Sequence, residues 1–385
     1  MVVVMTMHKI GLICEYNPFH NGHLYHIERI KELYPDSILI LVLSTCFTQR
    51  GNISTLTKEE KTAISLKYGI DLVVELPFIF STQSADIFAK GAISILKELG
   101  CDTLVFGSES NDIDKLKEIA NIQLNNSLYD DLVKSYLDDG VNYPTAMSNA
   151  IKDISDLDIG TPNDLLGLSY VKEIMRQEAN IIPITIQRTN DFHGEDLDKK
   201  IVSATAIRKA LDEDLDIKDN VPLEVYELLK NKKNLDFFNY LKYKILNEGR
   251  NINKYQTVDE GLENRIINYI DKCNDIDTLI DKIKTKRYTY NKLSRMLIHI
   301  LVSFTKEEAI DQDIHYIRVL GFNNFGKEYL NGIKKNIKVP IITNIKKKDE
   351  ELLNISIRTE KIYSLIINGD LNSYKNPPIY IEKRD

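Results

Sequence analysis

Two histidines near the N-terminus have the spacing and the surroundings of a phosphate-handling site. They are His20 and His23, in the segment NPFHNGH at residues 17–23. Gly22 between them would let the backbone approach a bound group closely, and a helix beginning at His23 would present unpaired N–H groups to a phosphate. Imidazoles flanking that position can stabilise the charge that develops on the α-phosphate during nucleotidyl transfer. We therefore predict that His20 and His23 are catalytic.

Two other interpretations of these histidines remain open from the residues alone. With His26 they form an H-x-x-H-x-x-H series that could bind zinc, although three ligands from one short turn and the following helix start would be hard to arrange tetrahedrally. They could also be ordinary capping or surface histidines. We expect no metal ion bound by protein ligands.

The elements around this segment predict an α/β fold. A buried strand, HKIGLICEY, precedes it, and HLYHIERIKELYP has the apolar spacing of a helix that ends at Pro35. Thr57 and Glu60 form a capping box at a later helix start. Further strands are expected at SILILVLST, DLVVELP, CDTLVFG and PITIQR. Strands alternating with helices at this length pair in parallel, so we predict a doubly wound, Rossmann-like parallel sheet. The histidines would lie at the carboxyl end of its first strand.

A chain of 385 residues is long enough for two domains. We predict a catalytic domain over residues 1–229, with a helical insertion at about residues 111–160, and a mostly helical domain over residues 230–385 with a late strand at VPIITN. Acidic residues predominate before residue 230 and basic residues after it, although the net charge is −7. Such asymmetry is typical of a protein in which one domain does chemistry and another binds a polyanion. It would also arise by chance between two solvated surfaces.

The sequence lacks the marks of a secreted, membrane or disulfide-rich protein. Its start, MVVVMTMHKIGLI, has neither a cationic n-region nor a small-residue cleavage site, and no run of about eighteen apolar residues follows. The cysteines show no C-x-x-C pairing and are expected to be small buried side chains; they are Cys14, Cys46, Cys101 and Cys273. We therefore expect a cytoplasmic protein with no membrane partner.

A second motif, SATAIR at residues 203–208, lies far downstream of the histidines. Alone it is weak evidence, because Ser203 could be a simple N-cap and Arg208 a solvated side chain. Together, a strand followed by H-x-G-H and a later S-x-T-x-I-R resemble the signature of the HIGH-type nucleotidyltransferase superfamily. The resemblance implies that the helix start at Ser203 and Thr205 binds the triphosphate with Arg208, which we add to the catalytic residues.

Longer segments resemble one family within this superfamily, the bacterial tRNA(Met) cytidine acetate ligases. They are GLICEYNPFHNGHLYHI, TQRG, DLVVELPF, TPNDLLGLSYVK and KRYTYNKLSRMLIHIL, which together span most of the chain. The resemblance implies an ATP-dependent ligase that forms acetyl-adenylate from acetate and ATP and releases pyrophosphate. It implies transfer of the acetyl group to N4 of the wobble cytidine (C34) of elongator tRNA(Met), giving N4-acetylcytidine. Mg²⁺ is expected to accompany the nucleotide.

The same resemblance implies a set of ATP-binding residues. One part is the first turn, which comprises Ile13, Cys14, Glu15, Tyr16, Asn17, Pro18, Phe19, His20, Asn21, Gly22, His23, Leu24, Tyr25 and His26. The other part lies later in the chain and comprises Gly107, Asn163, Arg188 and Thr189. The family tends to have a lysine and a tyrosine-histidine pair around this arginine, where this chain reads IQRTNDFHG.

These later residues also have simpler interpretations. Gly107 could be a turn glycine, Asn163 a helix N-cap or turn residue, and Arg188 the ion-pair partner of Asp191. Residues 49–51 (QRG), after the second strand, could hold acetate or the target base.

A basic stretch in the second half is a candidate RNA-binding surface. It contains Lys286 and four residues that follow one another at helical spacing, beside two tyrosines that could stack on unpaired bases; the four are Arg287, Asn291, Arg295 and His299. An ordinary solvated helix face would look similar.

Two rival functions remain. A small-molecule adenylyltransferase of cofactor biosynthesis needs the same two motifs but leaves the long basic region unexplained. A non-catalytic RNA-binding protein with a nucleotide fold would not need His20, His23 and Arg208.

Overall fold

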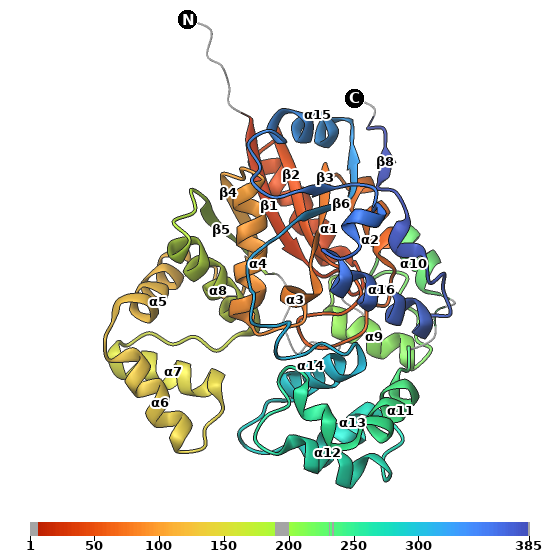
Figure 1. Cartoon of the computed structure of the whole chain (residues 1–385). Coiled ribbons are helices and arrows are strands. Elements are labelled where there is room, and N and C mark those ends of the chain that lie inside the picture. Colours follow the sequence, from red (N-terminus) through yellow and green to blue (C-terminus); the bar gives the residue numbers. More distant parts are fainter. Residues whose placement is uncertain (1–6, 189–199, 231, 233–234, 384–385) are drawn as a thin grey trace, which may run out of the picture.

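The computed structural model describes residues 7–188, 200–230, 232 and 235–383, and a single central sheet organises them (Figure 1). In the described residues this sheet has eight strands in the order β5-β4-β1-β2-β3-β6-β7, with β8 paired to β6. The strands are β1 (His8–Cys14), β2 (Ser37–Ser44), β3 (Leu72–Leu76), β4 (Thr103–Ser108), β5 (Ile182–Gln187), β6 (Ile317–Asn323), β7 (Ile341–Ile342) and β8 (Ile379–Ile381).

The strand order creates a switch point beside β1. The chain builds β1, β2 and β3 outward in one direction and then returns to place β4 on the other side of β1, all in parallel. In open sheets of this kind, ligands bind at the carboxyl ends of the strands where the order reverses. The predicted doubly wound parallel sheet is confirmed, and the H-x-G-H segment follows the strand at the switch point.

Helices cover both faces of the sheet, which explains why its central strands are continuous apolar runs. Alternate residues of β2 enter opposite cores: Ile40 faces one and Leu41 the other. The first core is completed by α4 (Ala85–Glu98), α5 (Ile113–Asn125), α8 (Pro162–Arg176) and α15 (Asn324–Ile333). The second is completed by α1 (Asn21–Leu33), α2 (Lys58–Lys67), α9 (Ala204–Asp212) and α10 (Leu223–Leu229). The capping box predicted at Thr57 and Glu60 is present at the start of α2.

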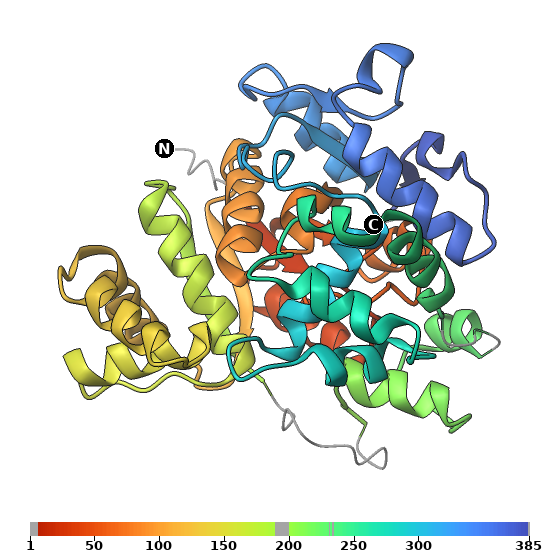
Figure 2. The same cartoon turned by 60° about the horizontal axis from the view of Figure 1, so that its bottom comes forward.

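Two groups of helices lie outside this sandwich. The first group consists of α6 (Tyr129–Asp138) and α7 (Tyr143–Ile154), which follow α5 within residues 111–160 and extend away from the sheet (Figure 1). A second group, which we call the helical bundle, lies at the front of Figure 2 and has a hydrophobic core of its own. It consists of α11 (Phe238–Glu248), α12 (Leu262–Ile270), α13 (Ile276–Ile283) and α14 (Tyr290–Leu301). Phe47 and Phe78 from the N-terminal half are buried in that same core.

The chain after residue 310 returns to the sheet, although Tyr363 and Ile366 are buried in the core of the helical bundle. β6 joins the edge of the sheet antiparallel to β3, and β7 and β8 pair with β6. The late strand expected at VPIITN is present as β7, whereas β6 and β8 were not predicted from the sequence. α10 ends at Leu229 and α11 begins at Phe238. The proposed division of the chain at residue 229 stays a prediction.

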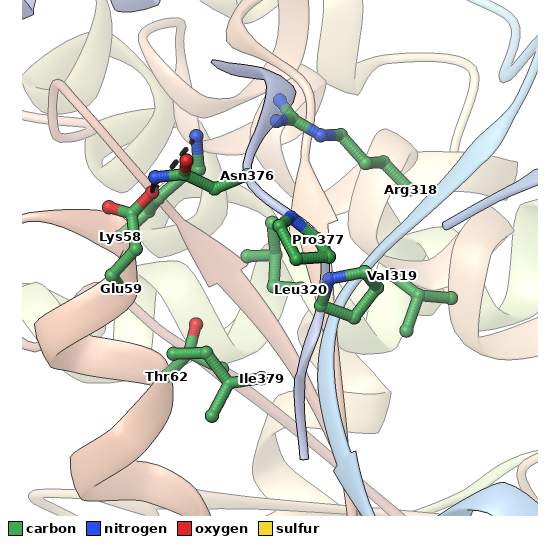
Figure 3. Close-up of a pocket in the computed structure, with 10 residues that line it drawn as sticks. Lys58, Glu59, Thr62, Arg318, Val319, Leu320, Asn376, Pro377 and Ile379 are labelled. Carbon is green, nitrogen blue, oxygen red and sulfur yellow. Dashed lines mark hydrogen bonds and ion pairs between the residues drawn. The ribbon is translucent and has the colours of Figure 1, made fainter. Parts of the chain in front are cut away.

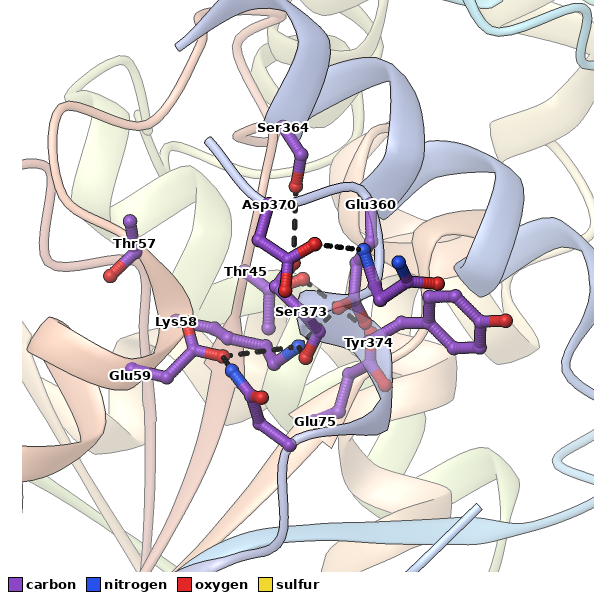
Figure 4. A network of polar contacts seen from close by, with 12 residues as sticks. Thr45, Thr57, Lys58, Glu59, Glu75, Glu360, Ser364, Asp370, Ser373 and Tyr374 are labelled. Carbon is purple, nitrogen blue, oxygen red and sulfur yellow. Dashed lines mark hydrogen bonds and ion pairs between the residues drawn. The ribbon is translucent and has the colours of Figure 1, made fainter. Parts of the chain in front are cut away.

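A buried cluster of charges explains why β6 was not predicted. Arg318 interrupts the apolar pattern of the strand, yet it is only 3% exposed. Its guanidinium donates to Glu75 of β3 at 3.2 Å and to Glu360 of α16 (Asn354–Ile366), which also pairs with Lys58 of α2. Figure 3 shows Arg318 and Lys58 lining a small cavity beside Ile379, and Figure 4 shows Lys58 among the carboxylates that converge there. The partners come from distant segments, so no local pattern reveals them.

Candidate active site

The H-x-G-H segment forms a tight turn between β1 and α1, with His20 as the N-cap of the helix. The Nδ1 atom of His20 accepts the Gly22 N–H at 3.0 Å, and Nδ1 of His23 accepts the His20 N–H at 3.2 Å. The two rings stack with centroids 3.8 Å apart. A neutral imidazole carries one proton, so both rings must hold it on Nε2. The turn therefore presents two adjacent Nε2–H donors.

Burial keeps both histidines uncharged. Together with the charges of Arg188 and Arg208, burial lowers the pKa of His20 to about 3. For the same main reason the pKa of His23 lies well below its usual value. Neither ring changes protonation near neutral pH. They can donate hydrogen bonds to a developing negative charge, but they are not general acids at that pH.

Gly22 is required by the closeness of its neighbours. A Cβ atom at this position would lie 2.9 Å from Cε1 of His20 and 3.3 Å from the Ile201 side chain. The turn thus has room for hydrogen only, and any side chain would push His20 out of place.

The S-x-T-x-I-R motif packs directly against this turn. Ser203 caps α9 by accepting the Ala206 N–H at 3.1 Å. The Arg208 guanidinium donates to the Asn17 carbonyl oxygen at 2.6 Å and to Thr205 Oγ1 at 3.2 Å. The fold therefore joins two motifs that are far apart in sequence, and it places a second helix start and a guanidinium beside the histidines.

The other predicted ATP-binding residues lie around the same edge of the sheet. Arg188 follows β5, its backbone N–H donates to the Ser108 carbonyl oxygen at 3.0 Å, and its side chain packs over Gly107. Both contacts hold Arg188 at the carboxyl ends of β4 and β5. Asn163, in the first turn of α8, donates to Glu109. Thr189 lies outside the described residues.

The side chains of the first turn have different tasks. Tyr16 and Phe19 are buried in the core, where Phe19 stacks on Tyr68, so only their backbone atoms are available to a ligand. Asn17 is also buried and ties the turn to the loop after β2, because its Nδ2 donates to the Ile53 carbonyl oxygen at 3.1 Å. The remaining half-buried members of the predicted stretch lie along the end of β1 and the first turns of α1: Ile13, Cys14, Glu15, Asn21, Gly22, His23, Leu24, Tyr25 and His26.

Lys61 also lies at this edge and was not predicted from the sequence. This residue of α2 is 1% exposed, and its ammonium donates to the carbonyl oxygens of Glu15, Ser44 and Thr45 at 3.0, 2.6 and 2.8 Å. Burial lowers its pKa to about 8. Lys61 therefore fixes the ends of β1 and β2 relative to each other. The sequence signal that could have revealed its burial is that Lys61 lies at helical spacing from Ile64, on the apolar side of the helix.

Metal ligation finds no support in the described part of the chain. No group of three or more His, Cys, Asp and Glu side chains gathers there to hold an ion, and Nδ1 of both His20 and His23 is occupied by backbone N–H groups. The absence of a protein-bound metal stays a prediction. None of the helices in the described residues is long and apolar enough to cross a membrane.

The predicted RNA-binding stripe divides into two parts. Lys286, Arg287 and Asn291 are exposed, and Arg287 pairs with Glu260 at 3.2 Å. Arg295 is half-buried, and its Nη1 donates to the Gln49 carbonyl oxygen at 3.1 Å. The stripe is not one helix face, because Arg287 precedes α14 and the helix then passes into the core.

His299 was wrongly assigned to the RNA-binding surface. It is fully buried, its Nε2 lies 2.7 Å from the Thr82 carbonyl oxygen, and Nδ1 lies 3.1 Å from that of Gln256. Regular spacing from Arg295 could not reveal that this turn of α14 packs against the segment after β3. Burial lowers the pKa of His299 to about 4, against the opposing effect of these carbonyl groups.

Replacing His299 with glutamine is expected to reduce the acid sensitivity of folding. The folded pKa of about 4 lies below the ordinary value, so the unfolded chain binds an extra proton between about pH 6.5 and pH 4. Above about pH 6.5, His299 therefore leaves the free energy of unfolding unchanged. As pH falls from about 6.5 toward 4, it lowers the free energy of unfolding by up to about 1.4 kcal/mol per pH unit. Urea unfolding at about pH 7, 6 and 5 should show the wild type losing more stability than His299→Gln. Parallel losses in the two proteins would contradict the assignment.

Known proteins are similar to this chain over nearly its whole length. A sequence model of the HIGH Nucleotidyl Transferase family matches residues 7–376. The tRNA(Met) cytidine acetate ligase of Oceanobacillus iheyensis is 38% identical, in a match that covers 95% of this chain and 96% of the relative. This chain belongs to the tRNA(Met) cytidine acetate ligase family. The ligase of Bacillus subtilis (strain 168) is 36% identical and is matched over 97% of both chains.

Solved structures agree with this membership. The crystal structure of Thermotoga maritima TmcAL bound with alpha-thio ATP superposes with a TM-score of 0.88 at 28% identity, covering 98% of this chain and 100% of that one. The apo form of the same protein gives a TM-score of 0.89 over the same shares. The family resemblance inferred from the sequence is therefore confirmed, and the likeness extends over the insertion and the helical bundle.

Proposed function

We propose that this protein activates acetate with ATP and transfers the acetyl group to N4 of the wobble cytidine of elongator tRNA(Met). The observation that carries the proposal is the meeting of the two motifs: neutral His20 and His23 and the Arg208 guanidinium surround one helix start at the switch point of the sheet. Relatives similar over nearly the whole chain are tRNA(Met) cytidine acetate ligases, and a structural neighbour binds alpha-thio ATP.

The first step is an in-line displacement at the α-phosphorus of ATP. A carboxylate oxygen of acetate forms a new bond to the α-phosphorus. The bond between the α-phosphorus and the oxygen that bridges to the β-phosphorus breaks, which gives acetyl-adenylate and pyrophosphate. The Nε2–H groups of His20 and His23 donate to the oxygens on which negative charge increases, and Arg208 binds the departing pyrophosphate. Mg²⁺ accompanying ATP would neutralise phosphate charge, held mainly by phosphate oxygens and water.

The second step is acyl transfer to the cytidine amine. The N4 nitrogen attacks the carbonyl carbon of acetyl-adenylate, the bond to the AMP oxygen breaks, and the nitrogen loses a proton. The base must leave its stack to reach the pocket, as is common when proteins recognise unpaired RNA. Exposed Lys286, Arg287 and Asn291 are the proposed contacts to the tRNA backbone. A tRNA substrate implies a cytoplasmic reaction.

Labelled substrates test the proposal and separate it from its rivals. The protein is incubated with ATP and labelled acetate, with and without tRNA(Met). Acetate-dependent AMP and pyrophosphate, with acetate label in tRNA, are the expected products. Pyrophosphate release that requires a different acceptor would instead indicate a small-molecule adenylyltransferase. RNA binding without turnover would indicate a non-catalytic protein.

A further inference from the structure

Residues 46–55, which we call the bridging loop, connect the ATP-site turn to the helical bundle. On the side of the turn, the Gln49 N–H donates to Glu15 Oε1 at 2.5 Å. The Thr55 N–H donates to Asn17 Oδ1 at 2.8 Å, and Asn17 Nδ2 donates back to the Ile53 carbonyl oxygen at 3.1 Å. The loop and the H-x-G-H turn are therefore fixed to one another by three hydrogen bonds.

On its other side the bridging loop is held by α14. Arg295 Nη1 donates to the Gln49 carbonyl oxygen at 3.1 Å, and Ser294 Oγ donates to that of Gly51 at 2.9 Å. Gly51 has φ +82°, and a Cβ at this position would lie 2.4 Å from the Arg295 backbone nitrogen. Phe47 of the same loop is buried in the bundle core. The backbones of loop and helix are thus in direct contact, and a shift of one must move the other.

Gln49 is hydrogen-bonded both to the ATP-site turn and to α14. Its N–H is bonded to Glu15, the carboxylate that follows β1, and its carbonyl oxygen is bonded to Arg295 of α14. Glu15 is half-buried beside the site; burial raises the pKa of its carboxyl group, and the charges of Arg50, Lys61 and Arg208 oppose that rise. Moving Gln49 would therefore shift a carboxylate that lies within the electrostatic reach of Arg208.

A purely structural role does not explain why a charged side chain occupies position 295. Arg295 is half-buried, burial lowers the pKa of its guanidinium to about 10, and among the described residues no carboxylate forms an ion pair with it. A buried cation is destabilising without such a partner, and an apolar side chain would fill the space more favourably. The guanidinium instead donates to the Gln49 carbonyl oxygen, which is consistent with a task at the loop.

We propose that Arg295 is a positioning residue for acetyl-adenylate formation, acting through Gln49 and Glu15 on the ATP site instead of contacting tRNA. The inference rests on the proposed function. It assigns the tRNA contacts to the exposed Lys286, Arg287 and Asn291, and it makes α14 the element that joins the tRNA-binding part of the protein to the ATP site.

Three variants of the full-length protein test this assignment: Arg295→Ala, Arg295→Lys and, as a matched control, Arg287→Ala. Acetate-dependent exchange between ATP and pyrophosphate is measured without tRNA, and tRNA affinity is measured separately. Arg295→Ala should lower kcat of exchange about 10- to 100-fold, because misplacing groups at a reacting centre by about 1 Å has an effect of this order. Its KM for ATP and its tRNA affinity should change less than about threefold. Arg295→Lys, which can still donate to the Gln49 carbonyl oxygen, should recover most of the rate.

The control should behave in the opposite way. Arg287→Ala should weaken tRNA binding by a larger factor than it lowers kcat of exchange. Wild-type exchange in Arg295→Ala together with weakened tRNA binding would overturn the proposal, and so would equal losses in the Lys and Ala variants. If Arg295→Ala does not fold, Ser294→Ala tests the same connection, and an unchanged exchange rate in that variant would overturn it. If the wild type uses an acid other than acetate, the acetate assignment fails, and the same variants test Arg295 with that acid.

Discussion

His23→Ala is expected to lower the rate of acetyl-adenylate formation about 10²- to 10³-fold while leaving tRNA affinity nearly unchanged. The change removes one of two adjacent Nε2–H donors from a buried site, where a hydrogen bond to a developing charge is strongest. It also removes the acceptor of the His20 N–H, so part of the effect would come through His20. The measurement is acetate-dependent pyrophosphate release without tRNA, with tRNA affinity determined on the same preparation.

A control on the same helix separates catalysis from folding. Arg29 of α1 pairs with Glu32 on the surface, and Arg29→Ala should retain the wild-type rate. The loss of the capping contact in His23→Ala should lower the free energy of unfolding by only about 0.5–2 kcal/mol. Loss of both adenylate formation and tRNA binding in a folded His23→Ala protein would contradict the proposed division of labour between the two parts of the chain.

Arg318→Met is expected to lower the free energy of unfolding by about 3–5 kcal/mol. Arg318 is buried between Glu75 and Glu360, and its guanidinium also donates to the Tyr374 carbonyl oxygen at 2.8 Å. Methionine fills a similar volume but leaves Glu75 without its cation and Glu360 with Lys58 alone. Urea unfolding near neutral pH, monitored by circular dichroism, measures the difference.

Two further variants identify the cause of that loss. Arg358, on α16, pairs with the half-buried Glu308 at 2.9 Å, and Arg358→Met should lower the unfolding free energy by no more than about 1 kcal/mol. Adding Glu75→Gln to Arg318→Met should restore part of the stability, because one buried uncompensated charge is removed. A double variant no more stable than Arg318→Met would mean that lost packing, and not an unpaired carboxylate, causes the effect.

Local patterns predicted most elements of the N-terminal half. Each of its five parallel strands is a short, mostly apolar run, and helices between or after them have capping residues such as Thr57 and Ser203 at their starts. These signals are contained within a few neighbouring residues. The strand β6 lacked such a signal, because Arg318 is tolerated in it only through Glu75 and Glu360, which lie 243 and 42 residues away.

The residues of the candidate active site were also only partly predictable from local patterns. His20 and His23 could be proposed from the sequence because the order of residue types around a tight turn and a helix start is itself the chemical signal, and Arg208 could be proposed from the resemblance of SATAIR to the superfamily motif. Burial was not predictable: Lys61 and Arg295 resemble surface cations, and His299 resembles part of a basic face, whereas all three contact backbone carbonyl groups inside the protein. A charged side chain can be buried when carbonyl groups or carboxylates compensate it, and those groups come from other elements.

The α/β class and the two motifs follow from residue types at short spacing, and the family from the resemblance of longer segments, so all three could be predicted from the sequence. The neutrality of His20 and His23 could not, since their pKa values depend on burial and on charges that the fold brings to the turn, Arg188 for both histidines and Arg208 for His20. The return of the chain to the sheet through β6 and the contact of Arg295 with the bridging loop are likewise products of packing. Each arises between residues far apart in sequence, where the environment, and not the residue type, sets the physical behaviour of the side chain.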